Sequence, residues 1–183
     1  FLFGGCALDD DLWTNVSNVL RCNVASIGYR KSPDYKWRDV LSDAYESVKY
    51  LSKHSEEFGF DKDKICVMGQ SAGGNLAASV CIKAKQKGLD VIKYQILLDP
   101  FLDLATDPDQ KGDDGFSNVV AFIMNEQHAN AFDYKNPLCS PVYADNDMLK
   151  GLPHAICLCA ECDNLRPEAE NYCQMLRNAG VPV

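Results

Sequence analysis

Residues 69–75 of this chain read Gly-Gln-Ser-Ala-Gly-Gly-Asn, and the rest of the sequence is arranged around this run. A short apolar stretch, residues 65–68, precedes it, and a stretch with helical periodicity, residues 76–87, follows it. A strand, a tight glycine turn and a helix in that order form a nucleophile elbow, in which a strained turn lifts a serine above the edge of a sheet. We therefore interpret Ser71 as a nucleophile rather than as part of a plain glycine-rich turn.

The elbow also explains the glycines on both sides of the serine. Gly69 and Gly73 stand where side chains would collide with the strand and the helix that meet at the turn. A helix that begins directly after the serine directs unpaired backbone N–H groups towards a reacting carbonyl. The run therefore predicts both a nucleophile and part of its oxyanion-binding site.

Length and composition indicate one globular domain with a hydrophobic core. The chain has 183 residues, of which 46% are hydrophobic and 24% charged, and its net charge of −8 disfavours nucleic acid and anionic membranes as partners. No apolar run is long enough to span a bilayer, which takes about 18 residues. The nine cysteines are spread through predicted strands and helices, and this pattern favours reduced thiols and a cytoplasmic location.

The two ends of the sequence predict an internal piece of a longer protein, truncated at both ends. The chain begins at Phe1, without an initiator methionine, inside an apolar glycine-rich segment. It stops at residues 181–183, Val-Pro-Val, which resemble the start of another strand. Any targeting segment would lie outside the sequence.

Apolar runs and helical periods alternate along the chain. Strands are predicted at residues 1–6, 22–29, 64–68, 91–98 and 155–160, and helices at residues 12–20, 37–58, 76–87, 116–128 and 166–178. The nearly continuous apolar character of residues 91–98 predicts burial on both faces of the sheet. The alternation predicts an α/β fold with a mostly parallel, doubly wound sheet flanked by helices. We expect a single domain over residues 1–183, with a lid-like insertion at about residues 104–135.

Three further segments fall in a fixed order around the elbow. They are Phe-Leu-Phe-Gly-Gly at residues 1–5, Tyr-Arg-Lys-Ser-Pro-Asp at residues 29–34 and Glu-Cys-Asp-Asn-Leu-Arg at residues 161–166. With them the chain resembles the hormone-sensitive-lipase-like esterases of the α/β-hydrolase fold, which include bacterial acetyl esterases and arylacetamide deacetylases. In that family a His-Gly-Gly-Gly run precedes an aromatic residue and a glycine. Phe1 and Gly4 match these last two positions, and the run itself would lie upstream.

The resemblance implies a role for each matching residue. Ser71 would be the nucleophile, the backbone N–H of Ala72 an oxyanion-hole donor, and Asp163 the acid that orients a histidine. Asp163 follows a predicted strand end, where catalytic groups of this fold lie, but it also precedes a helix and could be an N-cap. Asp99 and Asp103 also follow a strand and are the alternative acids.

The general base is expected outside the sequence, a few tens of residues beyond Val183. This fold uses the order Ser, Asp, His, and no histidine follows Asp163. We interpret the three earlier histidines as structural: His54 lies on a helix surface, His128 ends a helix whose dipole favours a cation, and His154 begins a strand. The isolated chain should therefore be inactive.

Two clusters could be imagined as metal sites, and we interpret both as structural. The aspartates at residues 9–11 suit a helix start. Cys157, Cys159, Cys162 and Cys173 could bind zinc, but Cys157 and Cys159 alternate with apolar residues in one strand and would point to one buried face. We predict no metal and no cofactor.

Apolar residues of the insertion leave two interpretations open. They could line an acyl pocket, or they could pack as the apolar face of an ordinary helix. They are Phe116, Phe122, Ile123, Met124 and Phe132.

The sequence therefore predicts a serine carboxylesterase, lipase-like and of the acetyl-esterase type, acting on short-chain or small aromatic acyl esters through an acyl-enzyme. A small-molecule ester is the expected partner. Gln70 stands where many family members carry an acid, which would alter the environment of the serine. Two alternatives remain open: a non-catalytic small-molecule-binding member of the same fold, and an amide or formamide hydrolase.

Overall fold

The protein is described by a computed structural model that covers residues 2, 5, 10–112 and 115–183. Most of the strand expected at residues 1–6, and the family matches at Phe1 and Gly4, lie outside the described residues; residues 2 and 5 are described and are not part of a strand. Side chains of residues 115–117, which include Phe116, are likewise outside the description.

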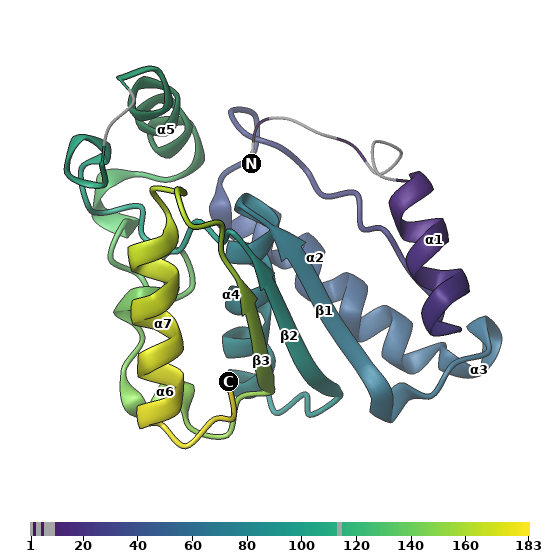
Figure 1. The fold of residues 1–183 in the computed structure, drawn as a ribbon. Coiled ribbons are helices and arrows are strands. Elements are labelled where there is room, and N and C mark those ends of the chain that lie inside the picture. The colour runs from purple at the N-terminus through teal and green to yellow at the C-terminus, as the bar shows by residue number, and fades with distance from the viewer. Residues whose placement is uncertain (1, 3–4, 6–9, 113–114) are drawn as a thin grey trace.

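The centre of the fold is a parallel sheet of three strands, β1 (Ile65–Gln70), β2 (Ile92–Leu98) and β3 (His154–Leu158), in the order β1-β2-β3. Gln95 of β2 pairs with Val67 of β1 and with Ala155 of β3. Figure 1 shows the strands running side by side, with α4 (Ala72–Gln86) behind them and α7 (Arg166–Asn178) beside β3. The parallel α/β architecture predicted from the alternating pattern is therefore confirmed.

The remaining elements precede β1 or connect β2 to β3. Before β1 come α1 (Asp10–Leu20), α2 (Trp37–Lys53), α3 (Ser55–Phe58) and η1 (Lys62–Lys64); between β2 and β3 come η2 (Pro108–Gln110), α5 (Gly115–His128), η3 (Ala131–Asp133), η4 (Pro141–Tyr143) and α6 (Asn146–Leu149). In Figure 1, α5 stands at the end of the molecule where the strands finish. The insertion thus lies at the end of the sheet that carries the serine turn.

The core lies on one face of the sheet, between the strands and α4. Leu97 and Ala155 point to this face and are buried, as are Ala78 and Ile82 of α4. Burying each large aliphatic side chain contributes roughly 1.5–3 kcal/mol. α4 is buried on most of its circumference because α2 packs on its far side.

The other face of the sheet is more open than the sequence predicts. Tyr94 and Ile156 are each 45% exposed, and Leu158 is 60% exposed. Burial of β2 on both faces was therefore a wrong prediction, because among the described residues α4 covers only the face that carries Leu97.

Two other predicted elements differ from the structure. Residues 22–29 form no strand, since they have no ladder partner among the described residues. The predicted helix at residues 37–58 is broken at His54, whose backbone leaves the helical region at φ −112° and ψ 21°. Its end at Gly59, in the left-handed conformation with φ 68°, is as predicted.

None of the described helices is both long enough and apolar enough to cross a bilayer.

Candidate active site

Ser71 occupies a strained turn between β1 and α4. Its backbone has φ 52° and ψ −113°, a conformation that costs a residue other than glycine about 1–3 kcal/mol. The residue itself is exposed. Backbone hydrogen bonds hold the turn: Ser71 N donates to Leu98 O at 2.9 Å, and Phe101 N donates to Ser71 O at 3.1 Å. Strain that is fixed in this way is a feature of functional sites, so Ser71 is the candidate nucleophile.

Close backbone approaches explain two of the glycines. A Cβ at Gly69 would lie 2.2 Å from the carbonyl carbon and oxygen of Gly73, and a Cβ at Gly74 would lie 2.7 Å from Cβ of Pro100. A Cβ at Gly73 would meet no described atom within 4 Å. The collision expected at Gly73 is therefore wrong; this glycine matters because its backbone packs against Gly69.

The first turn of α4 supplies backbone donors beside the serine. The first helical hydrogen bond runs from Asn75 N to Ser71 O at 3.1 Å, so the amide of Ala72 precedes the helical ladder. Ala72 N–H is thus positioned as the candidate oxyanion donor.

Asn75 fixes this turn against two loops, a role that the sequence interpretation missed. Its side chain is 2% exposed and donates to Phe101 O at 2.8 Å and to Cys139 O at 2.9 Å. A buried amide bonded to two carbonyls holds the loops after β2 and α5 in place. Its position at the end of the glycine run was the only signal in the sequence.

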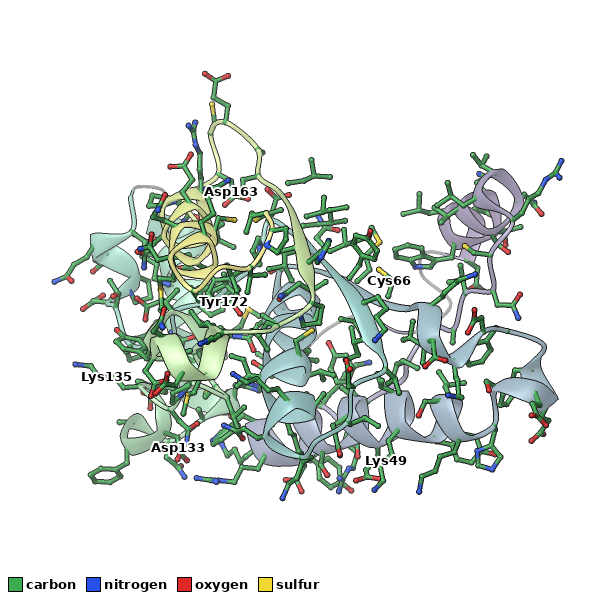
Figure 2. The ribbon with its side chains drawn as sticks, turned by 90° about the horizontal axis from the view of Figure 1, so that it is seen from below. Lys49, Cys66, Asp133, Lys135, Asp163 and Tyr172 are labelled. Carbon is green, nitrogen blue, oxygen red and sulfur yellow. The ribbon has the colours of Figure 1, made fainter. Side chains whose placement is uncertain are left out.

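Asp163 lies in the loop that joins β3 to α7 (Figure 2). It is half-buried, its N–H donates to Ala160 O at 3.2 Å, and its Oδ1 accepts from Leu165 N at 2.8 Å. The N-cap of α7 is Leu165, two residues further on. Asp163 therefore stabilises its own turn just before the helix and is not the N-cap itself.

The two alternative acids hold loops together. Asp99, with φ 39°, accepts a hydrogen bond from Ala160 N at 2.7 Å through Oδ1. Asp103 accepts from Thr106 N at 3.0 Å, from Thr106 Oγ1 at 2.6 Å and from Ala105 N at 2.8 Å. Burial opposes ionisation of Asp103, but these hydrogen bonds outweigh it and hold its pKa below the ordinary value. Both carboxylates are thus engaged in positioning backbone.

The serine and the acid are separated by one strand. β2 lies between β1, which leads to Ser71, and β3, which leads to Asp163. Neighbouring strands are about 4.8 Å apart, so two spacings put the last paired residues of β1 and β3, Gln70 and Leu158, roughly 10 Å apart. Ser71 follows Gln70 directly and Asp163 follows Leu158 by five residues, so both turns leave the sheet at the same edge.

All three histidines lie among the described residues, and each has a structural place. His54 lies at the carboxyl end of α2, and its Nδ1 contacts Tyr50 O at 2.8 Å. The chain runs from there to the amino end of β1, away from Ser71. His154 begins β3, at the end of the strand away from Asp163.

His128 is buried and differs from the sequence interpretation. It is 1% exposed, and its Nδ1 lies 3.2 Å from Ser32 Oγ. Burial, with the Lys36 ammonium adding, lowers the pKa of His128 to about 3. The expected cation at the helix end is therefore wrong, because a neutral imidazole joins α5 to the turn at residues 31–36.

That turn is an anchor for both α2 and α5. Arg30 donates to Asp43 of α2 through Nε at 2.9 Å and through Nη2 at 2.8 Å. The hydrogen bond from Arg30 lowers the pKa of Asp43. Lys36 Nζ donates to Gln127 O at 2.7 Å. Residues 30–36 thus connect α2 to the insertion.

A buried ion pair supports the loop after β2. Lys111 Nζ lies 2.6 Å from Glu168 Oε2, and the two side chains are 7% and 9% exposed. The other Glu168 oxygen accepts from Leu102 N and from Asp103 N. Burial raises the pKa of Glu168, and the Lys111 charge opposes this rise. Glu168 therefore ties α7, directly after the acid turn, to the loop beside Ser71.

Two cavities lie at opposite ends of the sheet. One of about 260 Å³ lies beside the ion pair, and its lining includes Asp103, Thr106, Lys111, Asn164, Glu168 and Asn171. The other, of about 520 Å³, lies at the amino ends of β2 and β3 and is lined in part by Lys93, Tyr94 and His154. The described residues contain no group of three or more His, Cys, Asp or Glu side chains that could hold a metal ion. Cys157 and Cys159 are half-buried, in contrast to the fully buried face predicted from their alternation.

The insertion residues considered for an acyl pocket differ in exposure. Phe122 is 58% exposed, Ile123 is 50% exposed and Phe132 is fully exposed, whereas Met124 packs against the core. Of these four residues, Met124 alone packs inward, while Phe122 and Ile123 of α5 form an apolar surface at the end of the sheet that carries Ser71.

Comparison with known proteins places this fold in a family. The chain belongs to the α/β hydrolase fold family, whose sequence profile matches residues 1–183. Its relatives include an arylesterase of Saccharolobus solfataricus, 33% identical over 194 residues, in an alignment that covers 100% of this chain and 61% of that protein. The carboxylic ester hydrolase LipN of Mycobacterium tuberculosis is 34% identical over 175 residues, which cover 87% of this chain and 45% of LipN.

A solved structure supports the same family. The carboxylesterase EstE1, cloned from a metagenomic library, superposes with a TM-score of 0.91 at 30% identity, covering 98% of this chain and 63% of that one. The resemblance and the fold class predicted from the sequence are confirmed. The chain spans between 45% and 63% of the length of these three proteins.

Proposed function

We propose that the protein containing this chain is a serine carboxylesterase acting on short-chain or small aromatic acyl esters. The observation that carries the proposal is the strained, exposed turn of Ser71 at φ 52° between β1 and α4. Relatives named arylesterase and carboxylesterase support an ester as the bond that is cleaved.

In the proposed reaction, Ser71 Oγ attacks the ester carbonyl carbon while a histidine takes its proton. The Ala72 N–H donates to the oxyanion, with a second donor from the glycine run that the family carries before the position of Phe1. The protonated histidine then gives its proton to the departing alcohol. Water hydrolyses the acyl-enzyme by the same proton transfers, which releases the acid and restores Ser71.

Asp163 is the proposed partner of that histidine. It would hold the imidazole in the correct tautomer and stabilise the imidazolium that forms. Both turns leave the sheet at the carboxyl edge of its parallel strands, where the catalytic groups of such sheets gather, and this supports the role. Because the three histidines of the chain have structural places, we place the base outside residues 1–183.

We also propose that the insertion at about residues 104–135 acts as a lid. Its helix α5 lies at the end of the sheet that carries Ser71, and it presents Val119, Phe122 and Ile123, each at least 50% exposed. Such an apolar surface suits the acyl or aryl part of a substrate. His128 and Lys36 would set its position through their contacts across the anchor turn.

The test is hydrolysis of p-nitrophenyl acetate and p-nitrophenyl butyrate by the complete reading frame that contains these residues. Ser71→Ala should lower the turnover number by at least ~10⁴-fold, because the residual rate then comes only from binding and the oxyanion hole. Residues 1–183 alone should be inactive, since one lost oxyanion donor already costs ~10²–10³ in turnover.

Two results would contradict the proposal. A folded wild-type protein without turnover on either ester would favour a binding role or an amide substrate. Turnover that survives Ser71→Ala would remove this serine from the reaction. Matching circular dichroism spectra of the two proteins provide the control for folding.

A further inference from the structure

The loop that follows β2, residues 99–103, contacts both the serine turn and the acid turn. On one side, Phe101 N donates to Ser71 O at 3.1 Å. On the other, Asp99 Oδ1 accepts from Ala160 N at 2.7 Å, directly before the acid turn. This loop is therefore a piece of backbone through which the positions of the two turns depend on each other.

A single carboxylate attaches this loop to α7. Glu168 lies in the first turn of α7, five residues after Asp163, and its Oε1 accepts from Leu102 N and from Asp103 N, the latter at 3.2 Å. Leu102 is fully buried, so water does not readily replace this acceptor. In Figure 1, α7 lies beside β3 and is joined to it by the loop that carries Asp163. Glu168 thus connects the helix after the acid turn to the loop that holds the serine turn.

Lys111 pairs with this carboxylate and contacts the same loop. Its Nζ lies 2.6 Å from Glu168 Oε2, donates to Asp103 O, and stands 4.4 Å from the centre of the Phe101 ring. Both charged side chains are less than a tenth exposed. Removing one partner of a buried pair leaves an uncompensated charge, which is strongly destabilising, so the two charges have to be changed together.

We propose that Glu168 is a positioning residue for the ester hydrolysis, holding residues 99–103 so that Ser71 and Asp163 keep their relative places. This inference rests on the proposed function. Glu168 acts through the loop, as the acceptor for two N–H groups, and Lys111 compensates its charge in the interior. Reacting groups tolerate little displacement, since a misplacement of about 1 Å can cost ~10²-fold in rate.

Two neutral pairs of substitutions isolate the acceptor. Lys111→Met combined with Glu168→Gln keeps an acceptor oxygen for the two N–H groups. Lys111→Met combined with Glu168→Met fills a similar volume but has no acceptor. Neither pair leaves a charge in the interior, and apolar replacement of a buried ion pair is often neutral for stability. The difference between the two double variants therefore measures the effect of the acceptor alone.

Phosphorylation of the serine by diethyl p-nitrophenyl phosphate provides the readout, in the complete reading frame that contains these residues. Each reactive serine releases one p-nitrophenol, so the amplitude counts active sites and the rate constant reports how well each serine is placed. The Glu168→Met pair should react ~10- to 10²-fold more slowly per site than the Glu168→Gln pair. With p-nitrophenyl acetate, kcat should fall by the same factor while KM stays nearly unchanged.

Glu170→Met is the matched control on the same helix. Glu170 lies two residues further along α7, is exposed, and pairs with Arg166 at 2.7 Å. Its replacement changes the same residue type on α7 without touching residues 99–103, so it should react at the wild-type rate.

Three results would overturn the inference. Equal rate constants for the two double variants, with only the amplitude or the stability lowered in the Glu168→Met pair, would limit Glu168 to folding. An equal loss in Glu170→Met would assign the effect to α7 as a whole. A wild-type protein that neither hydrolyses the esters nor reacts with the phosphate would remove the proposed function, and the inference with it.

The two failures are distinguishable. Wild-type turnover that Ser71→Ala abolishes, together with equal rate constants in the double variants, overturns the inference and leaves the proposed function standing. Where the Glu168→Met pair does not fold, Glu168→Asp replaces it: the shorter side chain keeps the charge and withdraws the acceptor from the loop. It should lower the rate constant at full amplitude, and an unchanged rate constant would contradict the positioning role.

Discussion

The serine turn follows β1 and the acid turn follows β3, and different forces hold them. At Ser71 the support is steric: Gly69 packs on the backbone of Gly73 so closely that a Cβ would lie 2.2 Å from it. At Asp163 the support is polar: Asp99 holds Ala160, and Ala160 O accepts from Asp163 N at 3.2 Å. Beside their backbone hydrogen bonds, the serine turn thus depends on the close approach of two glycines, and the acid turn depends on the side-chain acceptor of Asp99.

This difference decides what a sequence can reveal. Where two backbones approach too closely for a Cβ, only glycine fits. Such a contact can therefore be recognised in the sequence, as a glycine at a fixed spacing. A polar contact can be made by many residue types from many positions in the chain. Asp99 lies 61 positions before Ala160, and nothing in the sequence connects the two.

The largest effect should come from Gly69→Ala. The added methyl group meets backbone atoms of Gly73, which cannot rotate away, so we expect destabilisation beyond the roughly 1–3 kcal/mol of ordinary overpacking. Urea unfolding of the complete protein would measure the loss, and failure to obtain folded protein is the extreme form of the same result.

Gly73→Ala is the matched control for this prediction. Its Cβ meets no described atom within 4 Å, and alanine favours the helix that Gly73 occupies, so the free energy of unfolding should change by less than about 1 kcal/mol. Equal losses in the two variants would show that the contact between the two glycines does not shape the elbow.

A smaller effect is expected at Asp99. Asp99→Ala removes the acceptor for Ala160 N and places alanine at φ 39°, which together should cost about 2–4 kcal/mol of stability. Asp99→Asn keeps an acceptor oxygen and tolerates positive φ, so it should recover most of the loss.

Kinetics separate positioning from bulk stability at this residue. If Asp99 aims the acid turn, Asp99→Ala should lower kcat roughly tenfold or more, at a temperature where the variant is fully folded, with KM nearly unchanged. Asp99→Asn should restore kcat. Equal kcat in wild type and Asp99→Ala would limit the role of Asp99 to folding.

The fold was largely predictable because it rests on local patterns. The apolar run before Ser71, the glycines after it and the helical period of α4 are encoded in adjacent residues, and they locate β1, the turn and α4. The strand expected at residues 22–29 failed because a strand requires a pairing partner, which composition alone does not specify.

The support of the site was harder to predict because it depends on contacts between distant residues. Glu168 resembles an ordinary first-turn helix acid, yet it pairs with Lys111 in the interior. His128 resembles a helix-end cation, yet the packing of α5 buries it against Ser32. In both cases burial, which follows from tertiary packing, changes what the residue does.

The contrast between steric and polar support also predicts how stability depends on pH, because polar contacts depend on protonation and steric contacts do not. His128 is the polar group concerned. The pKa of His128 is about 3 in the folded protein, against 6.5 for an ordinary histidine, so between these values the unfolded chain binds a proton that the folded protein does not. Stability from His128 is therefore present above pH 6.5 and is lost as the pH falls towards 3. Linkage gives a loss of about 2 kcal/mol between pH 7 and pH 5.

Urea unfolding at a series of pH values would measure this loss, with His128→Gln as the variant that cannot titrate. His128→Gln should be less stable than wild type at pH 7, because a buried hydrogen bond is altered, and the difference should shrink as the pH falls. His154→Gln, at the exposed start of β3, shows what removing an imidazole alone does to the profile. If the free energy of unfolding changes with pH in the same way in wild type and in His128→Gln, the folded protein lets the imidazole take up its proton. The contact between α5 and Ser32 would then adjust to protonation, whereas the elbow is rigid.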